Sequence, residues 1–180
     1  MDDYIVLSKF CIGTDEDDKN YNLPLPADNE ELETLCDSLG VSVDKFYIID
    51  FHFKDVDIEY IYDHSDIYDM EIYDFLSTYD ILKKLSEEDL SYIGKYMSSE
   101  DHNLELQELL NKLEDGKKII LFEEFLDEIK NSMEEKEKQM FERFYNWIPP
   151  EERRNMVEAY YLTDEDEIVE SEEFDFVCLK

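Results

Sequence analysis

The sequence predicts an α+β fold, an elongated acidic protein built from two or three small α/β modules. Two patterns lead to this expectation. Runs of β-branched and aromatic residues near both ends of the chain are typical of strands. Between them, apolar residues recur with the period of amphipathic helices. Only four glycines and four prolines interrupt the 180 residues, so we expect modules that pack without flexible linkers.

The first module, residues 1–62, is expected to be a β-α-β-β unit. YIVLSKFCI at residues 4–12 has the composition of a strand, and the polar segment GTDEDDKNYN follows it as a loop. LPLP at residues 23–26 is extended because each proline restricts the residue before it. FYIIDFHF at residues 46–53 is rich in strand-forming side chains and predicts the second strand.

Between these strands, capping residues predict one helix. Asp28 and Glu31 have the spacing of a capping box, and Gly40 is suited to the left-handed position after the last turn. The apolar residues between them have helical spacing: Leu32, Leu35, Cys36 and Leu39.

The segment DVDIEYIY, residues 55–62, alternates in a way that predicts the last strand of this unit. One face would be buried and the other would be acidic. The buried face would hold Val56, Ile58, Tyr60 and Tyr62. The opposite face would hold Asp55, Asp57, Glu59 and Ile61.

The second module, residues 63–116, is expected to be helical. Ser65 is a candidate cap for a helix over residues 66–84, and Ser86 is a candidate cap for the next, through about Met97. A third helix is predicted over residues 103–113, ending near Gly116. The apolar side of the first would comprise Tyr68, Ile72, Phe75, Leu76, Tyr79 and Leu82.

The third module, residues 117–180, is expected to mix helices with short strands. A strand in KKIILFEEF (117–125) would lead into one long helix that ends at Trp147, with Pro150 as the first residue of another helix. The stretch EIVESEEFDFVCL (167–179) predicts one or two closing strands. The inner side of the long helix would hold Phe122, Leu126, Ile129, Met133, Met140 and Phe144.

Charge is the unusual property of this chain. It has 50 acidic and 17 basic residues, a net charge of −33. The excess is distributed, because residues 1–80 hold 22 acids and 4 bases whereas residues 81–180 hold 28 and 13. Self-repulsion destabilises a compact state, which favours an elongated shape. A solvated surface without a binding function stays open as the simplest alternative, whereas salt adaptation is disfavoured by the plentiful lysine, isoleucine and tyrosine.

No motif predicts catalysis or a cofactor. His52, His64 and His102 lack zinc-site spacing, and the glycines are too scattered for a phosphate-binding loop. The acidic segment around Asp15 and Asp17 resembles a calcium loop only loosely. We therefore expect no catalytic residue, metal site or cofactor, although a hydrolase with a carboxylate metal site stays an alternative.

The remaining features concern the compartment. Cys11, Cys36 and Cys178 are isolated and odd in number, which fits a reducing cytosol. The stretch MDDYIVLSKF lacks the basic and apolar regions of a secretory leader, and no segment has the apolar length of a membrane span. We expect a cytoplasmic protein that binds neither membranes nor nucleic acids, since phosphates repel it.

The charge itself predicts attraction to basic clefts that bind DNA. On a strand, Asp55, Asp57 and Glu59 would lie roughly 6–7 Å apart, a spacing comparable to that of backbone phosphates. Association with such a cleft would be fast and electrostatically steered. The candidate residues that would imitate phosphates are Asp55, Asp57, Glu59, Asp63, Asp66, Asp69, Glu71 and Asp74.

Several motifs resemble a known family. LPLPADNEELETLCDSLG, then FYIIDFHF and IEYIYDHSDIYDMEIYDFL, are similar to the N-terminal part of ArdA antirestriction proteins, most strongly over residues 22–80. Asp50 matches a characteristic strand aspartate of that family, and Glu59 with Tyr60 matches its E-Y pair. NLELQELLNKLEDGKKIILFEE resembles the next module of the family more faintly. GTDEDDKNYN stands where the family has an aromatic-rich strand.

The resemblance implies a curved, dimeric DNA mimic, carried by mobile elements, that acts in the bacterial cytosol. It would occupy the DNA-binding groove of a restriction-modification enzyme. A CRISPR effector nuclease is an alternative target, because it also presents a basic channel for duplex DNA. A further alternative is an acidic adaptor of a basic host protein that does not bind DNA.

Overall fold

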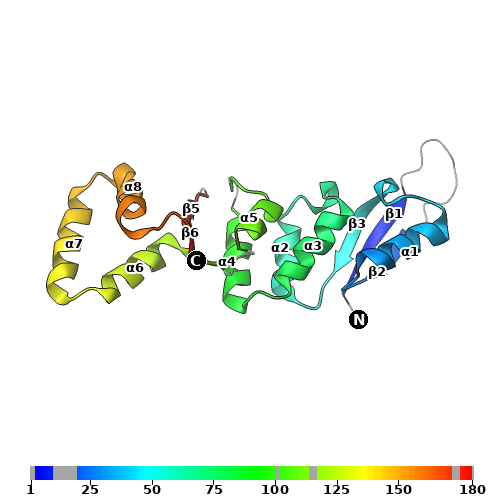
Figure 1. Ribbon diagram of the computed structural model, residues 1–180, viewed down its shortest axis with the longest axis horizontal. Helices are drawn as coiled ribbons and strands as arrows, with labels where there is room; N and C mark the ends of the chain where they lie inside the picture. The colour runs from blue at the N-terminus through cyan, green and yellow to red at the C-terminus, as the bar shows by residue number, and fades with distance from the viewer. Residues whose placement is uncertain (1–2, 10–19, 100–101, 114–116, 172–174, 180) are drawn as a thin grey trace. The chain divides into compact units, whose positions relative to one another are not determined.

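The computed structural model describes residues 3–9, 20–99, 102–113, 117–171 and 175–179. These residues form eight α-helices and two three-stranded antiparallel sheets, which confirms the α+β class (Figure 1). The chain divides into two compact units. Unit 1 comprises Met1–Ser98 with Glu105–Leu110, and unit 2 comprises Ser99–Leu104 with Asn111–Lys180. The module boundary expected after residue 62 falls inside a helix. The boundary expected after residue 116 lies at the edge of residues 114–116, which are outside the described ranges.

Unit 1 begins with a sheet in the order β2-β1-β3. Its strands are β1 (Tyr4–Lys9), β2 (Asn20–Pro24) and β3 (Phe46–His52). Ile5 pairs with Leu23 on one side and Phe51 on the other, and Ile5 and Leu7 are fully buried. The strands predicted near residues 4 and 46 are confirmed, although Cys11 and Ile12 lie outside the described residues. β2 starts at Asn20, inside the segment expected to be a loop.

Helix α1 (Asn29–Leu39) follows the predicted capping pattern. The Asp28 carboxylate accepts from Glu31 N at 2.8 Å, and the Glu31 carboxylate accepts from Asp28 N at 3.1 Å. Gly40 has φ of 64°, the left-handed conformation that a glycine adopts without strain. The helix buries Leu32 and Cys36, so both its ends and its inner side were predictable.

The strand predicted over residues 55–62 is wrong, because this segment forms helix α2 (Val56–Asp63). Asp55 caps it, and its carboxylate accepts from the N–H groups of Asp57 and Ile58. The helix buries Ile58, Ile61 and Tyr62, whereas Val56 is 75% exposed. The β-α-β-β unit is therefore a β-β-α-β unit followed by a helix. The alternation of apolar and acidic residues over 55–62 favours a strand, but the cap at Asp55 and tertiary packing stabilise a helix instead.

Helix α2 packs on α4 (Glu87–Met97) through a glycine. A Cβ atom on Gly94 would lie 3.2 Å from the Tyr60 ring, tighter than ordinary van der Waals contact. Gly94 therefore permits the close approach of the two helices. Ser86 caps α4 as predicted, accepting from Asp89 N at 3.1 Å.

The helix predicted over residues 66–84 is shorter than expected. A 3₁₀ turn, η2 (Ile67–Asp69), precedes helix α3 (Ile72–Leu82). Ser65 does not cap α3, because its hydroxyl donates to the Ile61 carbonyl at 2.7 Å. Tyr68, expected on the buried side, is 57% exposed, whereas the other five residues of that side are buried.

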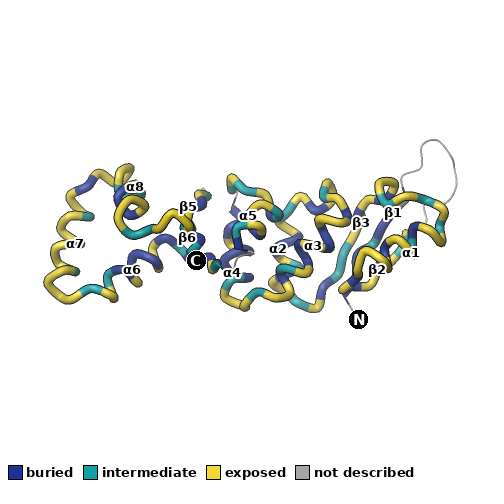
Figure 2. The backbone as a smooth tube through the Cα atoms, in the orientation of Figure 1, coloured by how far each residue is buried: buried dark blue, intermediate teal, exposed yellow. Residues whose placement is uncertain are grey.

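Stacked aromatic rings fill the centre of unit 1. Ring centroids lie 5.2 Å apart for Phe53 and Tyr62, 4.9 Å for Tyr62 and Phe75, and 5.6 Å for Phe53 and Tyr79. The Tyr62 hydroxyl meets Thr78 Oγ1 at 2.8 Å, so this buried polar atom is satisfied. Figure 2 shows the resulting alternation of buried and exposed positions along α2 and α3.

Asp3 connects this core to the sheet. Its carboxylate accepts from the Tyr79 hydroxyl at 2.6 Å and from Lys54 N at 2.8 Å, and Lys83 Nζ lies 3.5 Å away. Burial acts to raise the pKa of Asp3, but the hydrogen bonds from Tyr79 and Lys54 and the charge of Lys83 outweigh it and lower that pKa. Burial and the bond to Asp3 raise the pKa of Tyr79.

Unit 2 contains the second sheet, in the order β4-β6-β5, and three helices. The division between the units falls within α5 (Leu106–Leu113), which begins later than predicted. The remaining elements are β4 (Lys118–Leu121), α6 (Phe122–Ser132), α7 (Glu135–Trp147), α8 (Pro150–Tyr161), β5 (Glu167–Val169) and β6 (Phe176–Leu179). Pro150 at the start of α8 and the closing strands are as predicted. Gly116 lies outside the described residues.

The single long helix predicted up to Trp147 is wrong, because it is interrupted after Ser132. Glu134 forms a capping box with Glu137 and starts a separate helix, α7. The residues of α7 that face inward therefore do not continue the apolar spacing of α6. As a result Phe141 is buried, whereas Met140 and Phe144, expected on the inner side, are exposed. Among the described residues, no helix has both the length and the apolar character required to cross a bilayer.

Replacing Asp3 with alanine is expected to lower the free energy of unfolding by about 3 kcal/mol, because the buried Tyr79 hydroxyl and Lys54 N–H lose a charged acceptor. Urea denaturation of Asp3→Ala measures this loss, with the exposed Asp66→Ala as control. Because the folded pKa of Asp3 is lowered, its contribution is complete above the unfolded pKa of about 3.9 and is lost as the pH falls through the folded pKa. A difference between the proteins that stays unchanged down to pH 2 contradicts this role.

Candidate protein-interaction surface

The eight acids predicted to imitate phosphates all lie in unit 1, on α2, η2 and the start of α3. We call them the acidic surface: Asp55, Asp57, Glu59, Asp63, Asp66, Asp69, Glu71 and Asp74. No lysine or arginine occurs in residues 55–82, the segment that forms these three elements. Six of the eight side chains are exposed, and Asp55 and Glu59 are half-buried. The predicted exposure therefore agrees with the structure for six of the eight acids and not for Asp55 and Glu59.

Helical geometry sets the spacing of the acids on α2. Asp55, Glu59 and Asp63 follow one another at intervals of four residues, which is about 6 Å of rise per step. The expected row of Asp55, Asp57 and Glu59 along a strand is wrong, because Asp57 lies on another side of the helix. Like charges four residues apart destabilise a helix by about 0.2–0.5 kcal/mol per pair, so the repulsion within this row opposes the stability of α2, although Asp55 also stabilises the helix as its cap.

Helix ends add to this cost. Asp63 is the last residue of α2 and Asp80 lies in the last turn of α3, where the helix dipole presents its negative end. Neither helix has a basic residue in its last turn. Asp55 and Asp74 lie at helix starts and are favourable there. The acids are thus ordered on the surface even where the helices would be more stable without them.

Basic partners are scarce on the acidic surface. Among the described residues, Glu59 alone of the eight lies within ion-pair distance of a basic group, with its carboxylate 3.7 Å from His52 Nδ1. Unit 2 differs, because Arg154 forms ion pairs with both Glu170 and Asp175, and Lys112 meets Glu167 at 2.6 Å. Seven of the eight acids on the acidic surface therefore have no basic group within ion-pair distance among the described residues.

The histidines and cysteines show no arrangement that supports metal binding or covalent chemistry in the described part of the chain. Within the described ranges, no three His, Cys, Asp or Glu side chains are arranged to hold a metal ion. His64 Nδ1 lies 2.8 Å from the Tyr60 carbonyl, and His102 Nδ1 lies 3.0 Å from that of Ser99. Burial raises the pKa of the Cys178 thiol to about 11 and also raises that of Cys36. Both thiols are therefore protonated at neutral pH and poorly nucleophilic.

Comparison with protein families and with curated proteins identifies no relative. No protein-family model matches the chain, and no curated protein matches it at a significant level. The resemblance to ArdA proteins over residues 22–80 thus stays a prediction that rests on its motifs. Sequence reasoning missed four exposed tyrosines on or next to the acidic surface, because aromatic residues in amphipathic segments usually indicate a core. They are Tyr47, Tyr60, Tyr68 and Tyr73.

Asp55 is expected to matter for stability more than for charge. Asp55→Ala should lower the free energy of unfolding by about 1 kcal/mol, because two backbone N–H groups lose their side-chain acceptor. Asp55→Asn should cost far less, since its amide oxygen accepts the same bonds. Thermal or urea unfolding of both variants measures the difference. Equal losses would show that charge, not capping, is the contribution of this residue.

Asp63 is expected to have the opposite effect. Asp63→Asn removes a charge from the negative end of α2 and from its pair with Glu59, so the protein should become more stable by about 0.3–1 kcal/mol at low salt. The gain should shrink at 1 M salt, where screening extends over only about 3 Å. Destabilisation by this substitution would show that the carboxylate has a structural role.

Proposed function

We propose that this protein is a DNA-mimic inhibitor of a bacterial DNA-targeting defence enzyme. Its acidic surface occupies the basic groove in which that enzyme holds DNA. In this proposal the protein acts by binding and not by catalysis, in the cytosol of the host bacterium. The resemblance to ArdA proteins supports a restriction-modification enzyme as the target and a homodimer as the active form.

The observation that carries the proposal is an acidic surface that is ordered and in which only Glu59, beside His52, has a basic group within ion-pair distance among the described residues. α2 and α3 bury Ile58, Ile61, Phe75 and Tyr79, and these contacts fix the helix backbones that display the acids. The repulsion within the row on α2 and the position of Asp63 at the negative end of that helix oppose folding, so helix stability does not explain Glu59 and Asp63. Binding to a basic groove does, because cations there would relieve the repulsion.

The charge spacing on α2 indicates that a DNA-binding groove would have to contact many carboxylates at once. Duplex DNA carries one charge per about 1.7 Å of axis, whereas the row on α2 supplies one per about 6 Å of rise. One helix is therefore too sparse, and the charges of α2, η2 and α3 have to act together. Exposed pairs contribute about 0.2–1 kcal/mol each, so single neutral substitutions should have small, graded effects.

The proposal predicts inhibition that weakens with salt. Purified restriction-modification enzymes and CRISPR effector nucleases are tested for DNA binding with increasing amounts of the protein, at 50 mM and 200 mM salt. For the true target we expect DNA to be displaced and the required concentration to rise by about tenfold or more at the higher salt. Inhibition that is insensitive to salt, or enzyme inhibition with DNA still bound, would contradict mimicry.

Two matched variants test which acids contribute. The first combines Asp63→Asn, Asp66→Asn, Asp69→Asn and Asp74→Asn on the acidic surface. The control combines Glu142→Gln, Glu151→Gln, Glu152→Gln and Glu158→Gln, four exposed acids of unit 2. At about 0.5 kcal/mol per carboxylate the first should weaken inhibition roughly 30-fold, clearly more than the control. Equal losses would show that net charge, and not this surface, determines binding.

The same experiment addresses the adaptor alternative. A basic host protein that does not bind DNA would be captured by the wild-type protein, while no enzyme of the panel would be inhibited. That outcome would replace the DNA-mimic proposal, although the acidic surface would keep its role in binding.

A further inference from the structure

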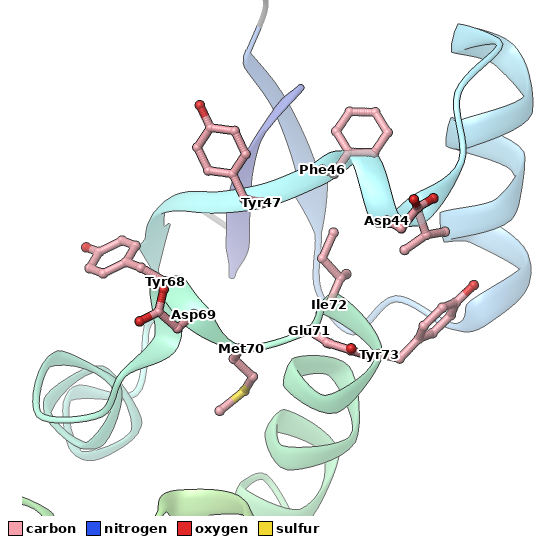
Figure 3. A pocket seen from close by; sticks show the side chains of 10 residues that line it. Asp44, Phe46, Tyr47, Tyr68, Asp69, Met70, Glu71, Ile72 and Tyr73 are labelled. Atoms are coloured by element: carbon pink, nitrogen blue, oxygen red, sulfur yellow. The ribbon is translucent and has the colours of Figure 1, made fainter. Parts of the chain in front are cut away.

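A cavity of about 390 Å³ lies beside the acidic surface, within unit 1. One wall comes from η1 (Val43–Lys45) and the start of β3, and the other from residues 68–73, which join η2 to α3 (Figure 3). A volume of this size is within the range of small-ligand sites and exceeds that of a single side chain.

Three tyrosines line this cavity and remain accessible. Tyr47 is 41% exposed, Tyr68 57% and Tyr73 39%. Figure 3 shows that Tyr47 comes from β3, while Tyr68 and Tyr73 stand at the two ends of the opposite segment. Aromatic faces attract cations within about 6 Å of the ring centroid, so accessible rings of this kind suit a cationic ligand.

Three carboxylates, Asp44, Asp69 and Glu71, line the same cavity. Lys45 Nζ lies 3.0 Å from Asp44 and offsets one charge. The helix dipole places about half a positive charge at the start of α3. Glu71 makes no capping bond there. Two uncompensated carboxylates outweigh that half charge, so the cavity favours cations over anions.

The segment from Tyr68 to Tyr73 is held in place before any ligand binds. Asp69 N donates to the Asp66 carbonyl at 3.1 Å, and Met70 N donates to that of Ile67 at 3.2 Å. The Tyr68 ring lies 6.5 Å from that of Phe51, and Ile72 within the segment is buried. A preformed wall reduces the entropy lost on binding.

We propose that this cavity is a binding pocket for an arginine side chain of the protein partner. The planar guanidinium would stack on a tyrosine face while its N–H groups donate to the carboxylates of Asp69 and Glu71. Arginine is favoured over lysine because it is planar and more weakly hydrated. The origin of the arginine in a DNA-binding groove rests on the proposed function, whereas the preference of the pocket for a guanidinium does not.

Peptide titration tests the pocket without the target enzyme. The ¹⁵N-labelled full chain is titrated with acetyl-Gly-Arg-Gly-amide, and with the same peptide carrying lysine or the neutral isostere citrulline. We expect saturable amide shifts at Tyr47 and over residues 68–73, with arginine binding at least threefold more tightly than lysine. Citrulline should bind at least tenfold more weakly than arginine. Equal binding of arginine and citrulline would overturn the inference.

Matched substitutions separate the pocket from general charge. Asp69→Asn lies in the pocket, whereas Asp74→Asn makes the same change on the acidic surface outside it. Tyr68→Ala removes an exposed pocket ring, and Tyr160→Ala removes an exposed ring on α8. Both pocket variants should weaken binding of the arginine peptide at least fivefold. Both control variants should weaken it less than twofold. Equal effects within each pair would overturn the pocket.

The two proposals fail separately. If the peptide results contradict the pocket while salt-sensitive inhibition of a nuclease is observed, the acidic surface stands and the arginine pocket does not. If the arginine peptide binds as expected while no enzyme of the panel is inhibited, the pocket stands and the DNA-mimic function does not.

Discussion

Repulsion among 33 surplus negative charges is the constraint on which the rest of this structure depends. Nearly every acid in the described ranges stays at the surface, while apolar and aromatic residues pack beneath the helices and sheets. Among the described residues Asp3 is the one buried acid, and it is surrounded by Tyr79, the Lys54 N–H and Lys83. Burying a carboxylate is expensive without such partners, so the exception follows the same physical rule.

The two units carry their acids differently. In unit 2, Arg154 and Lys112 neutralise acids of the closing strands, so part of the repulsion is relieved within the fold. In unit 1, the acidic surface lacks such cations and keeps its electrostatic free energy in the unbound state. A basic partner would release that energy on association, which links a cost in stability to a gain in affinity.

How much the sequence predicts depends on whether the signal is local. The cap at Asp28, the turn at Gly40, Ser86 before α4 and Pro150 before α8 were predictable, because each depends on nearby residues. Residues 55–62 and the break at Glu134 were not, since alternation and helical spacing coincide over short segments and tertiary packing decides between them. Six of the eight acids of the candidate surface are exposed as expected, whereas Asp55 and Glu59 are half-buried. The predicted spacing of these acids was wrong, because it assumed a strand where residues 56–63 form helix α2.

Trp147 has a consequence for experiments on this protein. It is the only tryptophan of the chain, it ends α7, and it is 81% exposed. Its fluorescence therefore starts from a largely aqueous environment and changes little when either core melts. The stacked rings of Phe53, Tyr62, Phe75 and Tyr79 lie in the asymmetric interior of unit 1, so near-ultraviolet circular dichroism of phenylalanine and tyrosine is the more informative optical probe of that core.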